Sequence, residues 1–261
     1  MKRFFIICVL ALLGAFFWDR IAPYLPTAMV SPERPVRDFD EAKKLLLEKV
    51  YYDHREDIYC GCPFDEKKRI DLAACGYVPR KDLKRAARIE WEHIVPAHAF
   101  GQSFPEWREG HPDCVGKEGK PFKGRNCARQ TSDRFRQMEA DMYNLYPAVG
   151  EVNGDRSNYS MAEIPGEVRE YGACDVEIAD HKIEPREAIS GIIARTYIYM
   201  DKEYPGHGIL SDKNRKLFAA WDGLYPVTEW ECERMRRIEA VQKNENTVLK
   251  KVCEEQGYAA E

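Results

Sequence analysis

The chain lacks a surplus of positive charge and lacks any obvious linker. Its 261 residues carry 40 Lys and Arg against 44 Asp and Glu, a formal net charge of −4. Any polyanion that binds must therefore be held by local basic clusters, because the protein as a whole is acidic. No Gly/Ser-rich stretch, internal repeat or low-complexity segment divides the sequence. This excludes a repeat architecture and predicts one domain with a sizeable hydrophobic core.

The N-terminal hydrophobic run is too short for an ordinary membrane span. It extends from Phe4 to Trp18, about fifteen residues behind Met1-Lys-Arg, whereas a spanning helix needs roughly 20. The pattern is typical of a signal peptide. We expect a signal peptide over 1–25, an exported domain over 26–261, and no stable membrane association once the signal is removed. Because no Ala-x-Ala cleavage site follows, an uncleaved N-terminal anchor is the alternative.

The cysteines lack the spacing of a usual zinc knuckle. Cys60 and Cys62 are separated by one residue, and no nearby His pair completes a zinc site. Cys8 belongs to the expected signal, so eight cysteines remain in the exported part. An even number in an exported chain predicts four structural disulfides, whose pairing stays open. One suggestion is local: Cys114 and Cys127 would close a loop of about a dozen residues.

Hydrophobic periodicity predicts more helix than strand, so the expected class is a helix-rich, mixed α+β fold. Ile89, Trp91 and Ile94 predict a short strand pair leading into Pro96. Asp38 or Asp40 is placed to cap the first helix. The predicted helices cover 38–52, 132–145, 186–203, 211–221 and 228–253, and the predicted loops cover 53–80, with short strands, and 105–130.

Two polar runs, 88–101 and 144–158, carry the residues with the clearest chemistry. The first places Glu92, an anionic oxygen ligand, beside His93, whose side chain ordinarily titrates near neutrality. The second contains Asn153 within an Asn-Gly-Asp-Arg segment. A base, oxygen ligands for a metal and nearby cations are the groups that metal-assisted phosphodiester hydrolysis requires.

Two basic clusters flank the first of these runs. Basic runs are often solvated faces, but their position on both sides of a hydrolytic site makes phosphate binding an equal alternative. The first cluster is Arg80, Lys81, Lys84, Arg85 and Arg88, and the second is Lys117, Lys120, Lys123, Arg125, Arg129, Arg134 and Arg136.

Landmarks over roughly residues 45–255 resemble the bacterial endonuclease I family of periplasmic or secreted nucleases. They follow the order that the family has, and so many short motifs in register indicate a common origin. The landmarks are Cys60-Gly-Cys62, Ala74-Cys-Gly-Tyr77, the run 88–101, Arg125-Asn-Cys127, Met138-Glu-Ala-Asp-Met142, the run 144–158, Ile193-Ala-Arg-Thr-Tyr-Ile-Tyr-Met200 and Tyr225-Pro-Val-Thr-Glu-Trp-Glu-Cys232.

The resemblance implies a ββα-metal, or His-Me finger, core and assigns roles to residues of both runs. His93 corresponds to the general base, and Glu92 and Asn153 correspond to the ligands of a Mg²⁺ ion, for which Ca²⁺ or Mn²⁺ can substitute. Glu139 and Asn144 match positions that support the site from behind.

The expected phosphate-binding arginine is displaced by one residue. The family usually has Gly-Arg-Lys-Asn-Cys, whereas this chain has Lys123-Gly-Arg-Asn-Cys127, so Gly124 occupies the arginine's place. We expect Arg125 to hold the scissile phosphate, because a guanidinium can grip two phosphate oxygens. Lys123 is the alternative.

Other polar residues near these runs are expected to have structural roles. His98 lies where the family often has Trp, and packing is favoured over a second site histidine. His54 is also expected to be structural. Asp155 and Arg156 directly follow Asn153 and Gly154, and we expect them to form an ion pair that fixes their loop.

The resulting hypothesis is an exported, Mg²⁺-dependent, monomeric endonuclease that cleaves DNA, and RNA as well, leaving 5′-phosphates. Low sequence specificity is expected, because Lys and Arg contacts to phosphates carry no sequence information and the sequence shows no recognition helix or zinc finger. Two alternatives remain: a non-catalytic, disulfide-stabilised binding protein of the same fold, and a zinc-dependent hydrolase.

Overall fold

A computed structural model describes residues 35–258 except 167. All of them belong to one compact unit, Arg34–Glu261. The expected signal peptide over 1–25 and Cys8 lie outside the described residues. Within the described part, none of the helices has both the length and the hydropathy needed to cross a membrane.

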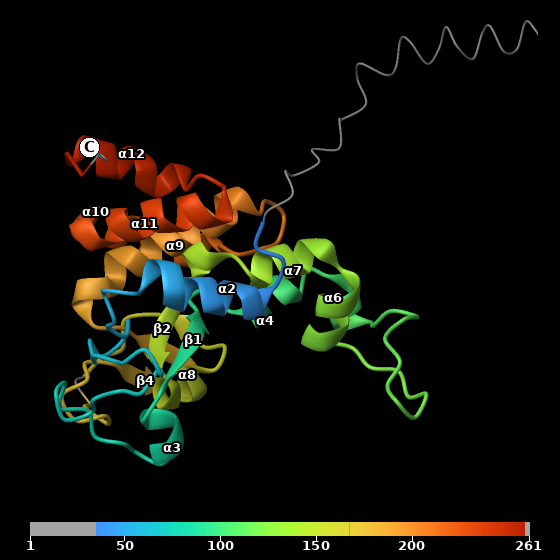
Figure 1. Ribbon diagram of the computed structural model, residues 1–261, viewed down its shortest axis with the longest axis horizontal. Helices are drawn as coiled ribbons and strands as arrows, with labels where there is room; N and C mark the ends of the chain where they lie inside the picture. Colours follow the sequence, from blue (N-terminus) through green and yellow to red (C-terminus); the bar gives the residue numbers. More distant parts are fainter. Residues whose placement is uncertain (1–34, 167, 259–261) are drawn as a thin grey trace, which may run out of the picture. The chain divides into compact units, whose positions relative to one another are not determined.

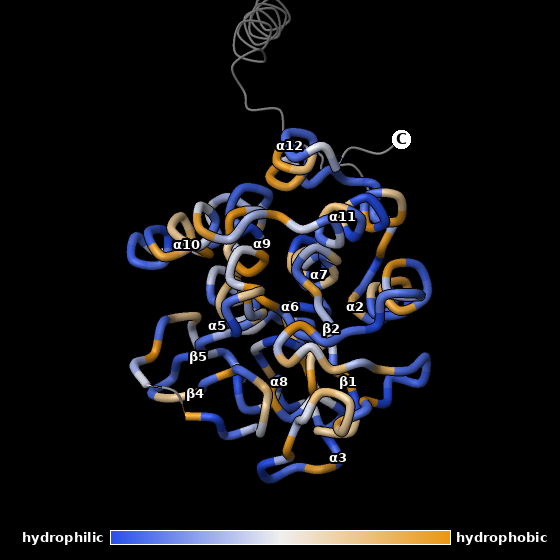
Figure 2. Tube along the Cα trace, turned by 90° about the vertical axis from the view of Figure 1, so that its left-hand side faces the viewer, coloured by the Kyte–Doolittle hydropathy of each residue, from blue (hydrophilic) through white to orange (hydrophobic). Residues whose placement is uncertain are grey.

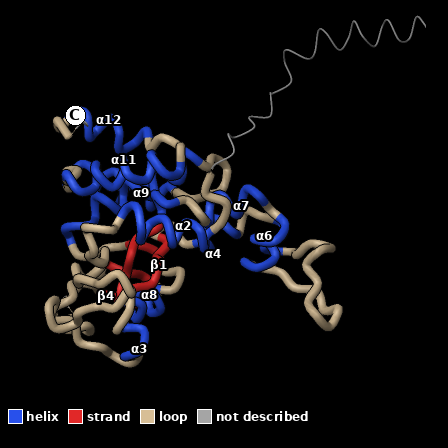
Figure 3. Tube along the Cα trace, viewed as in Figure 1, coloured by secondary structure: helices blue, strands red, loops and turns tan. Residues whose placement is uncertain are grey.

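Helices dominate this unit, as the sequence predicted (Figure 3). Four of them lie together at one end of the unit (Figure 1): α9 Ser190–Glu203, α10 Asp212–Leu224, α11 Glu229–Gln242 and α12 Thr247–Glu255. α9 packs against α10 and α12, and α12 also packs against α11. The apolar side of α12 is turned toward the other helices (Figure 2), which explains its burial of Leu249 and Cys253.

The helix predicted over 228–253 is in fact two helices. Lys243 adopts a left-handed conformation with φ of 61° and ends α11. Asn246 then caps α12, because its Oδ1 accepts hydrogen bonds from the backbone N–H groups of Val248 and Leu249. The apolar spacing continues across this break, so periodicity alone merged the two helices.

The N-terminal helix begins where the sequence predicted. Asp38 caps α2 Phe39–Leu45 by accepting a hydrogen bond from the backbone N–H of Glu41 at 2.9 Å. The chain continues without interruption into a short π-helix, η2 Leu46–Val50. Together α2 and η2 account for most of the predicted helix over 38–52.

A two-stranded antiparallel sheet lies beside these helices. It pairs β1 Ile89–His93 with β2 Leu145–Val149, with His93 opposite Leu145. Only one of the two strands predicted near 89–94 forms there, and its partner comes from far along the chain. Pro147 is tolerated in β2 because both strands of a two-stranded sheet are edge strands.

Directly after β2 the chain forms α8 Gly150–Arg156, which packs against both strands. The sequence analysis expected a loop around Asp155 and Arg156, not a helix. In front of β2, the predicted helix over 132–145 is shorter than expected: α7 Asp133–Glu139 is followed by the 3₁₀ turn η3 Met142–Asn144.

The loop predicted over 105–130 also contains helix at both ends. α5 Pro105–Arg108 and α6 Arg125–Thr131 flank an extended loop (Figure 1). The remaining short helices are α3 Leu83–Ala86, α4 Ala97–Gly101 and the 3₁₀ turn η4 Glu187–Ile189. A small second sheet, in the order β3-β5-β4, comprises β3 Ser160–Met161, β4 Glu177–Ala179 and β5 Lys182–Glu184.

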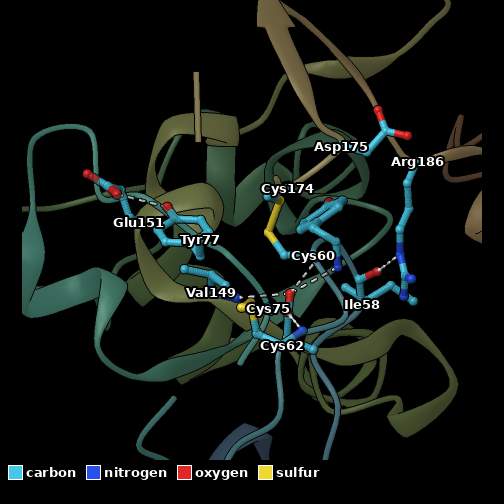
Figure 4. Close-up of a disulfide and its surroundings, with 12 residues drawn as sticks. Ile58, Cys60, Cys62, Cys75, Tyr77, Val149, Glu151, Cys174, Asp175 and Arg186 are labelled. Carbon is cyan, nitrogen blue, oxygen red and sulfur yellow. Dashed lines mark hydrogen bonds between the residues drawn. A yellow bond between two sulfur atoms is a disulfide. The ribbon is translucent and has the colours of Figure 1, made fainter. Parts of the chain in front are cut away.

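All eight described cysteines form disulfides, which confirms the four predicted bridges. The suggested Cys114–Cys127 bridge is among them and closes the base of the extended loop. Two more bridges leave the Cys60-Gly-Cys62 segment in different directions (Figure 4). The full set is Cys60–Cys174, Cys62–Cys75, Cys114–Cys127 and Cys232–Cys253.

The buried Asp57 carboxylate lies next to two of these bridged cysteines, but this group is not a metal centre. Cys60 and Cys62 are bridged and cannot act as thiolate ligands. The carboxylate instead accepts backbone hydrogen bonds from Tyr59, Cys60 and Cys62 at 2.7 to 3.1 Å. Since every described cysteine is in a bridge, the zinc-hydrolase alternative loses the thiolates on which it would depend.

Candidate active site

One cleft of about 460 Å³ brings together all four residues to which the sequence assigned site roles. Glu92 and His93 come from the end of β1, Asn153 from α8 and Arg125 from the start of α6. The cleft lining also includes Phe39, Trp91, Pro96, Ala97, His98, Trp107, Gly154, Ser157 and Asn158.

A second cavity of about 480 Å³ has a very different lining. It is dominated by the carboxylates of Glu163, Asp175, Glu177, Glu184 and Glu187, with Arg169 as the one basic lining residue. Such a cavity would repel a polyanion. None of the predicted site residues lines it, so the first cleft is the candidate active site.

The His93 imidazole is held in one tautomer. Its Nε2 lies 2.8 Å from the backbone carbonyl oxygen of Glu139. A carbonyl can only accept a hydrogen bond, so Nε2 carries the proton and Nδ1 of the neutral ring has a free lone pair. The ring of Phe39 lies 4.8 Å from the imidazole, centroid to centroid.

Burial and charge keep this imidazole neutral. His93 is 6% exposed. Its burial, together with the nearby Arg125 guanidinium, lowers the pKa of His93 to about 3. At neutral pH the side chain is therefore in the form that can accept a proton.

The Glu92 carboxylate is buried and held through one of its oxygens. Oε1 accepts hydrogen bonds from the Tyr59 hydroxyl at 2.8 Å and from Nη1 of Arg156 at 2.7 Å. Burial raises the pKa of Glu92, whereas Arg156 and Tyr59 act to lower it. Oε2 receives neither of these two bonds, so one oxygen of the carboxylate remains available to a ligand in the cleft.

Arg156 is fully buried and contacts the end of β1 at three points. Besides Glu92, it donates hydrogen bonds to the backbone carbonyls of His93 and Ile94, each at 2.7 Å. The expected ion pair between Arg156 and its neighbour Asp155 is therefore wrong. Adjacent residues of a helix point in different directions, and Asp155 instead pairs with Lys81 and accepts a hydrogen bond from Tyr171.

The Asn153 amide is also oriented by a partner. Its Nδ2 donates a hydrogen bond to Oε2 of Glu90 at 3.3 Å, which leaves Oδ1 free to act as a ligand. Glu90 is in turn paired with Arg85 at 2.5 Å and with Arg88 at 2.9 Å. Glu90 and Glu92 lie on the same face of β1, because alternate strand residues share a face.

Arg125 lies in the cleft with part of its guanidinium unpaired. Its Nε donates to Glu139 at 2.5 Å. Nη2 is buried and has no hydrogen-bond partner among the described residues. Lys123 lines a different depression, beside Glu109 and His111. Gly124, with φ of +86°, turns the chain so that α6 begins at Arg125.

Glu139 and Asn144, which the resemblance placed behind the site, connect its parts. The Glu139 carboxylate pairs with Arg125 and Arg129 while its carbonyl holds His93. Asn144 clamps the backbone of Val95 through two hydrogen bonds, at 2.7 and 3.0 Å. Both therefore fix the geometry of the cleft without lining it.

Most of the first basic cluster is already neutralised within the protein. Arg85 and Arg88 pair with Glu90, Lys81 pairs with Asp155, and Arg80 pairs with Glu170. Of this cluster's residues, Lys84 alone has no acidic partner among the described residues. This part of the cluster serves mainly to hold the site together.

Two further histidines, His54 and His98, differ in their surroundings. His54 stacks on Trp230 with a centroid separation of 3.8 Å, which agrees with its predicted structural role. His98 is exposed on the cleft wall, edge-on to Trp107. His98 is therefore not packed in the core, whereas the sequence had favoured a packing role for it.

The fold and cleft together define a disulfide-stabilised, helix-rich α/β protein with a buried histidine, oxygen ligands and arginines at one site. The family model described as Endonuclease I matches residues 39–253. The chain belongs to the endonuclease I family.

Several curated relatives match most of the chain. An extracellular deoxyribonuclease of Aeromonas hydrophila is 44% identical over 220 residues, covering 82% of this chain and 89% of the relative. A periplasmic deoxyribonuclease of the same organism is also 44% identical over 220 residues, covering 82% and 86%. Endonuclease-1 of Buchnera aphidicola subsp. Acyrthosiphon pisum is 40% identical over 227 residues, covering 85% and 84%.

Proposed function

We propose that this protein is an exported, Mg²⁺-dependent endonuclease that hydrolyses DNA with little sequence specificity and leaves 5′-phosphates. The observation that carries the proposal is the cleft that unites His93, Glu92, Asn153 and Arg125. Family membership and the names of the relatives support the nuclease activity and DNA as its substrate. RNA cleavage and a monomeric state are parts of the same proposal.

Export is supported by two independent observations. Four disulfides are typical of proteins that leave the cytoplasm, where thiols are kept reduced. Relatives are named as extracellular and periplasmic deoxyribonucleases. We therefore place the protein in the periplasm or outside the cell.

The residues of the cleft fit a hard divalent cation. Glu92 offers Oε2 and Asn153 offers Oδ1, and Mg²⁺ prefers oxygen ligands while keeping several waters. The hydrogen bonds made by Arg156 and Glu90 leave these two oxygens available. When bound, Mg²⁺ would stabilise the negative charge of the phosphate and of the leaving 3′-oxygen. The arrangement of β1, β2 and α8 agrees with the ββα-metal architecture that we propose for this core.

In the proposed reaction, Nδ1 of His93 takes the proton of the attacking water. The Glu139 carbonyl keeps the ring oriented, because it holds the opposite nitrogen. The Arg125 side chain lines the cleft and is 38% exposed, so its guanidinium can reach a non-bridging phosphate oxygen. A phosphate bound there would also offset the charge of Arg125 that lowers the pKa of His93, making the imidazole a stronger base.

The test is plasmid nicking by the wild type and His93→Ala side by side, in Mg²⁺ and in EDTA. Loss of a positioned general base should lower the rate by roughly 10²–10⁴-fold. The circular dichroism spectrum should not change, because no core is emptied. Nicking by His93→Ala at near the wild-type rate would contradict the assignment. Nicking in EDTA would contradict the metal requirement.

The displaced arginine was the feature that favoured a non-catalytic binding protein. Because Arg125 lines the cleft and its side chain is 38% exposed, that feature no longer supports the alternative.

A further inference from the structure

Three carboxylates at the candidate site are paired with arginine. Glu92 pairs with Arg156, Glu139 with Arg125 and Arg129, and Glu90 with Arg85 and Arg88. We call these eight side chains the site network. Five guanidinium groups surround three carboxylates, so the network has a formal excess of two positive charges. A site of this kind favours an anion and disfavours a free cation.

The proposed metal ligand is affected most directly. Glu92 supplies the one carboxylate among the two proposed ligands, and Arg156 already neutralises it at 2.7 Å. Both side chains are buried, at 3% and 0% exposure, so solvent screens the pair little. A divalent cation that approached Glu92 would meet the positive charge of Arg156 behind it. The other proposed ligand, Asn153, is neutral and brings no compensating charge.

The missing negative charge has an obvious source in a nuclease. Mg²⁺ commonly binds through one or two carboxylates together with substrate phosphates, and not in an all-protein cage. A phosphodiester held by Arg125 would offset the positive excess and offer an oxygen to the cation.

We infer that the divalent cation and DNA bind this site cooperatively, because Arg156 neutralises Glu92 and leaves the substrate phosphate to complete the cation's anionic ligands. The inference rests on the proposed function. The free protein binds Mg²⁺ weakly, and bound DNA strengthens that binding. Since such coupling is reciprocal, Mg²⁺ strengthens DNA binding by the same factor.

The experiment uses His93→Ala, which should bind DNA without cutting it. Its affinity for a short fluorescent duplex is measured by anisotropy at pH 8, in Mg²⁺ and in NaCl of equal ionic strength. Calorimetry measures Mg²⁺ binding to the same protein without DNA. Phosphate contacts alone predict that salt, including Mg²⁺, weakens binding. The inference predicts the opposite sign for Mg²⁺, with binding about fivefold tighter or more.

Two outcomes would overturn the inference: weaker DNA binding in Mg²⁺ than in matched NaCl, or Mg²⁺ binding to the free protein that DNA leaves unchanged. Wild-type nicking in Mg²⁺ and in EDTA is measured in parallel. If the wild type fails to nick, the proposed function itself fails. If it nicks only in Mg²⁺ but the coupling is absent, the inference alone is wrong.

Variants of the site network then locate the coupling. Arg156→Gln keeps an N–H donor for Glu92 but removes the charge, so Mg²⁺ binding to the free protein should strengthen and the effect of DNA should shrink. Tyr59→Phe removes a neutral donor from the same oxygen and should keep the coupling.

Arg195→Gln breaks a different buried pair, with Glu231, and controls for lost stability. If Arg156→Gln folds and Mg²⁺ and DNA still bind as cooperatively as before, then Arg156 is not the cause of the cooperativity. If that variant does not fold, the sign of the Mg²⁺ effect in His93→Ala decides the inference.

Discussion

Two buried arginine–glutamate pairs in this molecule differ in how the oxygens of the carboxylate are bonded. Arg195 donates to both oxygens of Glu231, each at 2.7 Å, in the helical region. Arg156 donates to Oε1 alone of Glu92, also at 2.7 Å, in the cleft. The two glutamates are 2% and 3% exposed, so burial does not distinguish them. The first pair satisfies both oxygens of its carboxylate, whereas the second leaves one oxygen free of either partner, as the ligand role that we propose for Glu92 requires.

Substituting each glutamate tests this comparison most strongly. Glu92→Gln should lower the Mg²⁺-dependent nicking rate by about 100-fold or more, the upper scale for changes around a metal site. Glu231→Gln should lower the free energy of unfolding by up to about 3–5 kcal/mol, as breaking a buried pair does, without changing the rate per folded molecule. Nicking rates and denaturant unfolding of both variants provide the check. Similar losses of nicking rate in both variants would contradict the distinction between Glu92 and Glu231.

Variants of Arg125 and Lys123 test which of these two cations holds the scissile phosphate. Arg125→Ala should lower kcat by about 100-fold, the scale on which a single transition-state donor acts. Lys123→Ala should leave kcat near the wild-type value, because Lys123 lines a different depression. Steady-state kinetics on a short duplex separates kcat from KM. A larger loss in Lys123→Ala would transfer the phosphate-binding role to that residue.

The disulfides extend the comparison to covalent links. Cys232–Cys253 ties α11 to α12 across a sequence separation of 21, and neither cysteine lines the cleft. Replacing both cysteines by Ser should cost about 3 kcal/mol of stability on the chain-entropy argument, with the rate per folded molecule intact. Thiol titration of the denatured mature wild type should find no free thiol. Two or more free thiols would contradict the four-bridge framework.

Part of the loss of folding stability at low pH should come from His93 in the cleft. The pKa of His93 is lowered to about 3 in the folded protein, so between pH 6.5 and 3 the unfolded chain binds a proton that the folded protein does not. The stability due to the neutral, buried imidazole is complete above pH 6.5 and is lost as the pH falls. His93→Ala should therefore lose about 2 kcal/mol less stability than the wild type between pH 7 and 4.5. Denaturant unfolding at both pH values measures this, and equal losses would contradict the shift.

The sequence predicted much of the helical framework because helical signals are local. Asp38 caps the first helix as expected, and the apolar spacing over 186–203 and 211–221 corresponds to α9 and α10. The partner of β1 was not identifiable, because strand pairing joins segments that are distant in the sequence.

The predicted site residues came from a resemblance, and in the structure all four of them line the same cleft. What the sequence did not reveal is how they are held. Arg156 and Tyr59 act on Glu92 from 64 and 33 residues away in the sequence, and no local pattern marks such contacts. One signal was available: Asn153 and Arg156 are three residues apart, the spacing that places two side chains on one side of a helix. Had α8 been recognised as a helix, this spacing would have argued against an ion pair between Arg156 and Asp155.

The Cys60–Cys174 bridge has a consequence for the lifetime of the protein outside the cell. It joins residues 114 positions apart, and Glu92, His93, Arg125 and Asn153 all lie between its two ends. A protease that cut the extended loop between α5 and α6 once would therefore not release a fragment, because both pieces remain joined through this bridge. A nicked molecule keeps its complete set of proposed catalytic side chains, which suits an exported protein that meets proteases.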